Sequence, residues 1–192
     1  NDSLNLSALK HAPESYKVND GVAFYYMNKA KDSTLSKAES DSLNRQAVYY
    51  YERAIRLVPD LQVGLINVGV CYYRLGDVLS AERHWLKLKE INPGYSGMKK
   101  INDDLAHYYV YKGIGQLDRK VYDSAEVSLM KGREYAATND SLGFLAWYNS
   151  ALMYNTTKRY PEAIDALGRV LKIRPDFQPA REGYKALSGR EW

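Results

Sequence analysis

Residues 65–93, LINVGVCYYRLGDVLSAERHWLKLKEINP, decide the fold. Apolar residues recur in this stretch at helical spacing on both sides of a break at Gly76, and a proline ends the second run. The pattern predicts two short antiparallel helices. Gly69 in the first helix and Ala81 in the second lack bulk, so the two backbones can approach closely there while larger side chains fill the space around them.

The same order of large and small residues returns in a second hairpin that ends at Pro175. Counted back from the closing prolines, Leu65, Gly69, Tyr72, Ala81, Trp85 and Leu88 in the first hairpin match Trp147, Ala151, Tyr154, Ala163, Leu167 and Val170 in the second. Two matching copies indicate an internal repeat.

Weaker copies occupy the rest of the chain. Counting back from Pro59 gives Ala47, Tyr51 and Ala54 for the second helix of a hairpin. Gly21 and Phe24 supply the first helix of that hairpin if extra residues lie between the two helices. A further copy, without a closing proline, contains Tyr109, Gly113, Ala125 and Leu129. Between residues 31 and 44 the chain has a polar insertion, which predicts that both flanking helices are longer by a turn or two and joined by a polar loop. A docking finger is the functional alternative for this insertion.

This pattern resembles the tetratricopeptide repeat, a helix-turn-helix unit of about 34 residues with large, small and aromatic residues at set places and a closing proline. The resemblance implies an all-α fold, a right-handed superhelical array of about four helical hairpins followed by a C-terminal capping helix. The expected segments are a lead-in at residues 1–13, repeats at 14–61, 62–95, 106–139 and 144–177, and a capping helix and tail at 178–192.

Composition excludes several classes of function. The net charge of +4 comes from 27 basic and 23 acidic residues spread along the chain, which is too mild and too mixed to predict binding to nucleic acid or to a membrane surface. No run approaches the roughly 18 apolar residues of a spanning helix, so we expect no membrane insertion by this segment. The single cysteine, Cys71, lies in a predicted helix and is expected to be buried.

No catalytic motif is found. His11, His84 and His107 are too far apart for a local metal motif, and Cys71 has no second cysteine nearby. Gly113 and Gly115 form a GxG, but inside a helical pattern and not after a strand. We therefore expect no enzyme activity, no cofactor and no metal site.

Binding is where the resemblance points. In tetratricopeptide proteins the first helices of the hairpins line a concave groove that holds a peptide or a segment of another protein, so a protein or peptide partner is implied. By register, the groove positions are Asn19, Val22, Tyr25, Ile66, Asn67, Val70, Tyr73, Tyr111, Ile114, Tyr148, Asn149 and Leu152. Most of them are apolar, which disfavours a clamp for a C-terminal carboxylate and favours an apolar peptide, a partner helix or the protein's own flanking segment.

Asparagine takes one equivalent groove position in three hairpins, at Asn19, Asn67 and Asn149. An amide can donate to a peptide carbonyl and accept from a peptide N–H, so a row of asparagines can hold extended backbone. This arrangement resembles the asparagine ladder of some peptide-binding tetratricopeptide proteins. The alternative is that each amide bonds only within its own hairpin.

A second resemblance comes from the first ninety residues. The run NDSLNLSALKHAPESYKVN, followed by a repeat with a long insertion, is similar to the tetratricopeptide tail of multi-pass membrane O-mannosyltransferase-like proteins. That resemblance implies a non-catalytic arm on the periplasmic or lumenal side of a membrane. A self-associating structural module is a third interpretation, since the apolar groove and Trp192 leave a homo-oligomer open.

Overall fold

The computed structural model describes residues 2–137 and 139–192, and this part of the chain forms ten helices and no strand. Their bounds are α1 Asp2–His11, α2 Tyr16–Lys29, α3 Lys37–Leu57, α4 Gln62–Arg74, α5 Val78–Ile91, α6 Met98–Asp118, α7 Tyr122–Tyr135, α8 Asp140–Thr156, α9 Tyr160–Ile173 and α10 Gln178–Ser188. The predicted all-α array of hairpins with a C-terminal helix is confirmed. The chain divides into two units, Asn1–Ser96 and Gly97–Trp192, which are described separately.

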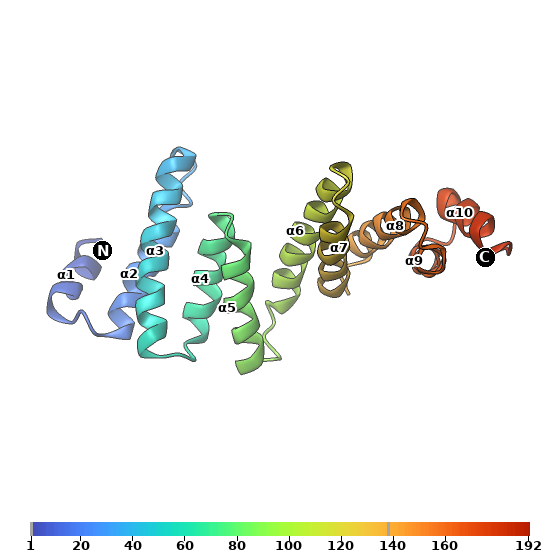
Figure 1. The fold of residues 1–192 in the computed structure, drawn as a ribbon. Coiled ribbons are helices and arrows are strands. Elements are labelled where there is room, and N and C mark those ends of the chain that lie inside the picture. Colours follow the sequence, from blue (N-terminus) through green and yellow to red (C-terminus); the bar gives the residue numbers. More distant parts are fainter. Residues whose placement is uncertain (1, 138) are drawn as a thin grey trace. The chain divides into compact units, whose positions relative to one another are not determined.

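The first unit contains α1 and two hairpins, α2/α3 and α4/α5, and α3 also packs on α4 (Figure 1). Local sequence sets where these helices begin. Ser36 precedes α3 in a capping box with Glu39, and Asp77 caps α5 by accepting a hydrogen bond of 3.1 Å from the N–H of Ser80. These caps satisfy N–H groups that have no partner inside the helix.

The α4/α5 hairpin is held together by the contact that its sequence predicts. A Cβ atom on Gly69 would lie 2.6 Å from Cε2 of Trp85, so only glycine leaves room for the indole. The indole N–H donates to the carbonyl of Ile66 at 3.2 Å. Trp85 is 2% exposed, and Cys71 on the same hairpin is fully buried, as expected. Burial raises the pKa of the Cys71 thiol to about 12.

The register of α2 differs from the prediction by two residues. Val22, Ala23 and Met27 are buried, whereas Phe24 is 52% exposed. Tyr26 stacks on Tyr50 of α3 with ring centroids 5.9 Å apart. In the next hairpin Tyr72 stacks on His84 in the same way. Therefore Ala23, which is fully buried, and Tyr26, which packs on α3, take the places of Gly69 and Tyr72, and Gly21 and Phe24 do not.

The insertion lengthens only one of its two flanking helices. The first helix, α2, ends at Lys29, residues 31–36 form the connection, and residues 37–44 of the insertion form the opening turns of the 21-residue α3. Lys37 pairs with Asp41 one turn later, a spacing that supports a helix at this exposed end. The prediction that α2 is lengthened as well was wrong, because its last buried residue is Met27 and the buried Ala30 caps the helix directly after Lys29.

The second unit contains hairpins α6/α7 and α8/α9 and the final helix α10, which packs on α9 (Figure 1). Close approach in the first of these hairpins again depends on glycine. A Cβ atom on Gly113 would lie 2.7 Å from Cγ of Leu129, and one on Gly132 would lie 2.7 Å from Cγ2 of Val110. Around α8 and α9 the buried core comprises Ala125, Phe144, Ala151, Met153, Tyr154, Ala163, Ala166, Leu167, Val170, Leu171 and Ala180.

Three hairpins turn in the same way. In the turn between the first and second helix of each hairpin, one residue has a left-handed backbone. Its φ is 82° at Gly76 and 60° at both Lys120 and Lys158. The residue that follows then donates its N–H to a carbonyl five residues earlier, over 2.8 to 3.0 Å. Such a motif satisfies the free carbonyls at the end of a helix. The common turn gives the second helices equivalent starts at Val78, Tyr122 and Tyr160.

Candidate functional site

A glutamate on one hairpin and a tyrosine on the next join the hairpins of the first unit. The hydroxyl of Tyr72 on α4 donates to Glu52 on α3 at 2.9 Å, and Nε2 of His84 lies 3.1 Å from the same carboxylate. The hydrogen bond with His84 lowers the pKa of Glu52, whereas burial and the bond to Glu52 raise the pKa of Tyr72 to about 12. These bonds hold α4 in a fixed orientation against α3.

The second unit has a comparable link. Tyr154 on α8 donates to Glu126 on α7 at 2.9 Å, and Arg159 donates to the other oxygen of that carboxylate at 2.7 Å. The hydrogen bond with Arg159 lowers the pKa of Glu126. The guanidinium also lies 4.6 Å from the ring centre of Tyr154. The glutamate thus fixes the relative orientation of α7 and α8.

Because the hairpins are fixed, the first helices of each unit lie against each other, α2 on α4 and α6 on α8. On α4 one side is buried, and the residues between the buried positions recur at helical spacing and keep accessible surface. We call the accessible residues of these helices the first-helix face. In unit 1 it comprises Phe24, Ile66, Asn67, Val70 and Tyr73, and in unit 2 it comprises Tyr111, Ile114, Tyr148, Asn149 and Leu152.

The first-helix face of unit 2 carries exposed apolar side chains on two helices, α6 and α8, that pack against each other. Tyr111 is 51% exposed and Leu152 is 45% exposed, while Ile114 is half-buried. Tyr148 is held by Phe177, whose ring meets it edge-on with centroids 5.0 Å apart. Aromatic and aliphatic side chains that are partly exposed and already packed on their neighbours offer contact area to a partner, and binding costs them little side-chain entropy.

In unit 1 two of the predicted groove residues are buried, and the others keep accessible surface. Asn19 and Val22 have no exposed surface, because the observed register of α2 turns them into the core. Tyr25 is half-buried and its ring lies 5.2 Å from that of Tyr26. Phe24, which the sequence assigned to the packed side of α2, is exposed instead. The spacing of Val22, Ala23 and Met27 is the signal that would have identified it.

Two of the three asparagine side chains, those of Asn19 and Asn149, form hydrogen bonds inside the protein. The amide of Asn19 donates to the carbonyls of Pro13 and Ser15, both at 2.8 Å, and the amide of Asn149 donates to the carbonyl of Leu145 at 2.8 Å. The bonds of Asn19 to Ser15 and of Asn149 to Leu145 fit the alternative in which each amide bonds only within its own hairpin. Asn67 and Asn149 keep some accessible surface.

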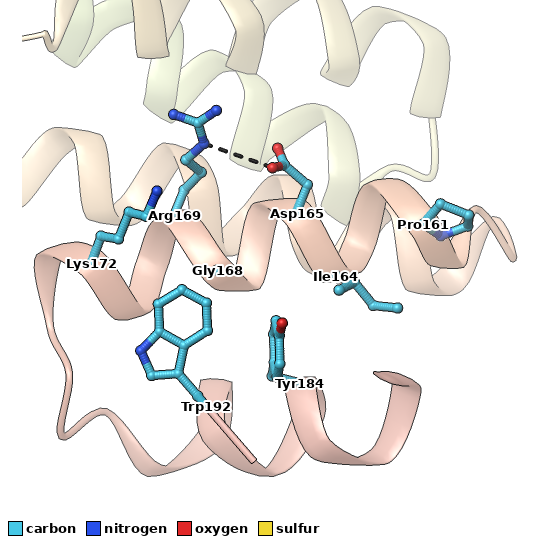
Figure 2. Close-up of a pocket in the computed structure, with 8 residues that line it drawn as sticks. All are labelled: Pro161, Ile164, Asp165, Gly168, Arg169, Lys172, Tyr184 and Trp192. Carbon is cyan, nitrogen blue, oxygen red and sulfur yellow. Dashed lines mark ion pairs between the residues drawn. The ribbon is translucent and has the colours of Figure 1, made fainter. Parts of the chain in front are cut away.

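A cleft of about 320 Å³ lies between α9 and the C-terminal segment. Figure 2 shows Trp192 and Tyr184 beneath α9, beside Gly168, with Arg169 and Asp165 above them. The chain reaches this place because Gly189, with φ of 70°, ends α10 and turns the tail back. A Cβ atom on Gly168 would lie 3.2 Å from Cζ3 of Trp192. The tail therefore covers apolar surface of the last hairpin.

Within residues 2–137 and 139–192, no group of three or more histidine, cysteine, aspartate or glutamate side chains is arranged to hold a metal ion. No helix in that part of the chain is long and apolar enough to cross a membrane. Cys71 is buried and its thiol pKa is raised, so this side chain is not an activated nucleophile.

One hairpin of the chain matches a known family. The tetratricopeptide repeat matches residues 145–177, which correspond to the α8/α9 hairpin. This match agrees with the register read from Ala151, Ala163 and Pro175. No curated protein matches the chain.

Solved structures with a similar arrangement of helices include other repeat proteins. The C-terminal part of a TPR repeat-containing protein from Cytophaga hutchinsonii is 16% identical, with a TM-score of 0.49 over 95% of this chain and 65% of that one. YrrB, a TPR protein with an unusual peptide-binding site, is 14% identical, with a TM-score of 0.37 over 96% of this chain and 100% of that one. The APC/C hetero-tetramer Cut9–Hcn1 is 16% identical, with a TM-score of 0.38 over 97% of this chain and 38% of that one.

Proposed function

We propose that this chain is a non-catalytic protein-interaction module, and that each unit holds a peptide or a segment of a partner protein on its first-helix face. The exposure of Tyr111 and Leu152 on the adjoining helices α6 and α8 carries the proposal. Large apolar side chains that are about half exposed on packed helices gain free energy when a partner covers them.

The chemistry of the face defines the segment that would bind it. In unit 2 the five residues of the first-helix face are apolar or neutral, so a partner brings apolar side chains and leaves no charge unpaired. The side-chain nitrogen of Asn149 donates to the carbonyl of Leu145. The side-chain oxygen of Asn149, Oδ1, is therefore the group that would accept a hydrogen bond from a partner N–H. The face therefore favours a short apolar peptide or an amphipathic helix over an acidic tail.

A displayed peptide library selected on the immobilised chain tests this proposal. We expect the selected peptides to be rich in apolar residues and to lose most of their affinity for Leu152→Asp. The matched control is Met130→Asp, because Met130 is 53% exposed on the second helix α7. Peptides that bind both variants equally, or that lose affinity only for Met130→Asp, would contradict binding by the first-helix face.

The resemblance to an arm of a membrane glycosyltransferase stays a prediction. The family match lies at residues 145–177, outside the ninety residues that carry that resemblance. Protease protection of the natural gene product in intact cells would test it, since a periplasmic or lumenal arm is protected from protease on the cytoplasmic side. Light scattering over a range of concentrations would test the third interpretation, self-association.

A further inference from the structure

The end of the first hairpin carries a polar pocket of about 410 Å³ that is separate from the first-helix face. It lies where α2 ends, α3 begins and α4 ends, all within unit 1. The insertion that lengthens α3 builds one of its walls. Its polar lining consists of Lys31, Lys37, Ser40, Asp41, Asn44 and Arg74.

The charges of this pocket are unbalanced. Its lining has three cationic side chains and one carboxylate, and that carboxylate, Asp41, is paired with Lys37 at 2.5 Å. Lys31 donates to the amide oxygen of Asn28 at 2.7 Å, and Arg74 reaches the carbonyl of Met27 at 3.5 Å. Across the described residues neither Lys31 nor Arg74 forms an ion pair. Both can therefore bind an anion at the mouth of the pocket.

A second observation concerns Asn44, which lines the same pocket and is only 1% exposed. Its amide nitrogen donates to the carbonyl of Ser40 at 2.9 Å, which fixes the orientation of the side chain. Its oxygen, Oδ1, accepts no hydrogen bond from any described residue. A buried acceptor without a hydrogen bond destabilises the folded chain, so a ligand that brings an N–H to this oxygen recovers free energy.

We propose that this pocket binds an acidic residue of a partner peptide. The side-chain carboxylate lies between Lys31 and Arg74, and a backbone N–H of the same segment donates to Oδ1 of Asn44. A peptide residue with a carboxylate offers both groups within one segment, whereas a simple carboxylate offers only the first. The site would add a charged contact at the hairpin end to the apolar contacts of the first-helix face.

Fluorescence anisotropy with a labelled, capped tetraglutamate peptide at low ionic strength tests the charged contact. The double variant Lys31→Gln, Arg74→Gln should weaken binding about tenfold or more, since it removes both free cations of the site. The control Lys17→Gln, Lys89→Gln removes the same charge from exposed positions on α2 and α5 and should change affinity little. Equal losses in the two variants, or no binding to the unaltered chain, would overturn the proposal.

Competition experiments on the same complex test the hydrogen bond. Glutarate, a dicarboxylate without an N–H, should compete weakly, and its affinity should be the same for Asn44→Ala as for the unaltered chain. The peptide should bind Asn44→Ala several-fold more weakly, with circular dichroism showing that the helices persist. Displacement of the peptide by inorganic phosphate at lower concentration than by glutarate would assign the pocket to phosphate instead. In an NMR titration with the peptide, changes in backbone amide chemical shift at Asn67 and Val70, and not at Ser40 and Asn44, would also contradict the proposed site.

Discussion

The indole of Trp85 lies against the backbone of Gly69, in space that a β-carbon on Gly69 would occupy. This contact sets the distance between α4 and α5, and the indole N–H is satisfied at the same time by the carbonyl of Ile66. Because the indole is 2% exposed, it fills the interior of the hairpin instead of covering its surface. The hairpin thus depends on a matched pair of the smallest and the largest side chain.

Removing the large partner of this pair should destabilise the first unit. Trp85→Ala leaves a cavity between α4 and α5, and we expect a loss of about 3–5 kcal/mol in the free energy of unfolding. Urea denaturation followed by circular dichroism measures this loss. Ala81→Leu should cost roughly 1–3 kcal/mol by forcing the same helices apart. Losses near zero for both variants would contradict the packing described for this hairpin.

Two glycines of α6 offer a matched test of close approach. A β-carbon on Gly113 would meet Cγ of Leu129 at 2.7 Å, whereas on Gly115 the nearest atom is the end of Arg119 at 4.0 Å. Gly115→Ala should stabilise the second unit by about 0.5–1 kcal/mol through helix propensity. Gly113→Ala should destabilise it, because overpacking costs roughly 1–3 kcal/mol. Changes of the same sign in the two variants would contradict the α6/α7 contact.

The left-handed turns predict gains from glycine. Lys120 and Lys158 both have φ of 60°, a conformation that costs a side chain with a β-carbon about 1 kcal/mol or more. Lys120→Gly and Lys158→Gly should each raise the free energy of unfolding by up to about 1 kcal/mol, and the reverse change Gly76→Ala should lower it by a similar amount. Thermal and urea denaturation of the three variants check this prediction. A loss of stability in both lysine variants would be the opposite result.

Acid should weaken the links between hairpins. The pKa of Glu52 is lower in the folded chain than in the unfolded chain, because His84 donates a hydrogen bond to its carboxylate. Its stabilising contribution is therefore complete above the unfolded pKa, near 4.3, and is lost as the pH falls through the lower folded value. Unfolding of the first unit, measured between neutral pH and about pH 3, should depend less on pH in Glu52→Gln. Glu90→Gln, at an exposed position on α5, is the control and should keep the original pH dependence.

The hairpins were predictable because residue size alone encodes their packing. Gly69, Trp85, Ala151 and Leu167 keep the same spacing relative to their closing prolines, and that spacing is local. The register of α2 was not predictable in this way, because Gly21 and Phe24 imitate the pattern in sequence. The choice between the two phases depends on which one buries more apolar surface against α3, and this depends on tertiary contacts.

The candidate sites also divide into one that local sequence predicts and one that depends on tertiary contacts. Accessible residues on α4, α6 and α8 follow from helical spacing once the hairpins are known. The pocket around Asn44 joins the ends of three helices that are more than forty residues apart at their extremes, from Ala30 to Arg74. No spacing rule connects Lys31 with Arg74, because the length of the α2–α3 insertion decides where they meet.

The most direct test of the central claim is photo-crosslinking of a library-selected peptide to the chain. A benzoylphenylalanine is placed either at position 152 on α8 or at position 130 on α7, both exposed sites in the second unit. Binding to the first-helix face predicts a crosslinked product from position 152 and little or none from position 130. A strong crosslink from position 130 with none from position 152 would contradict the account.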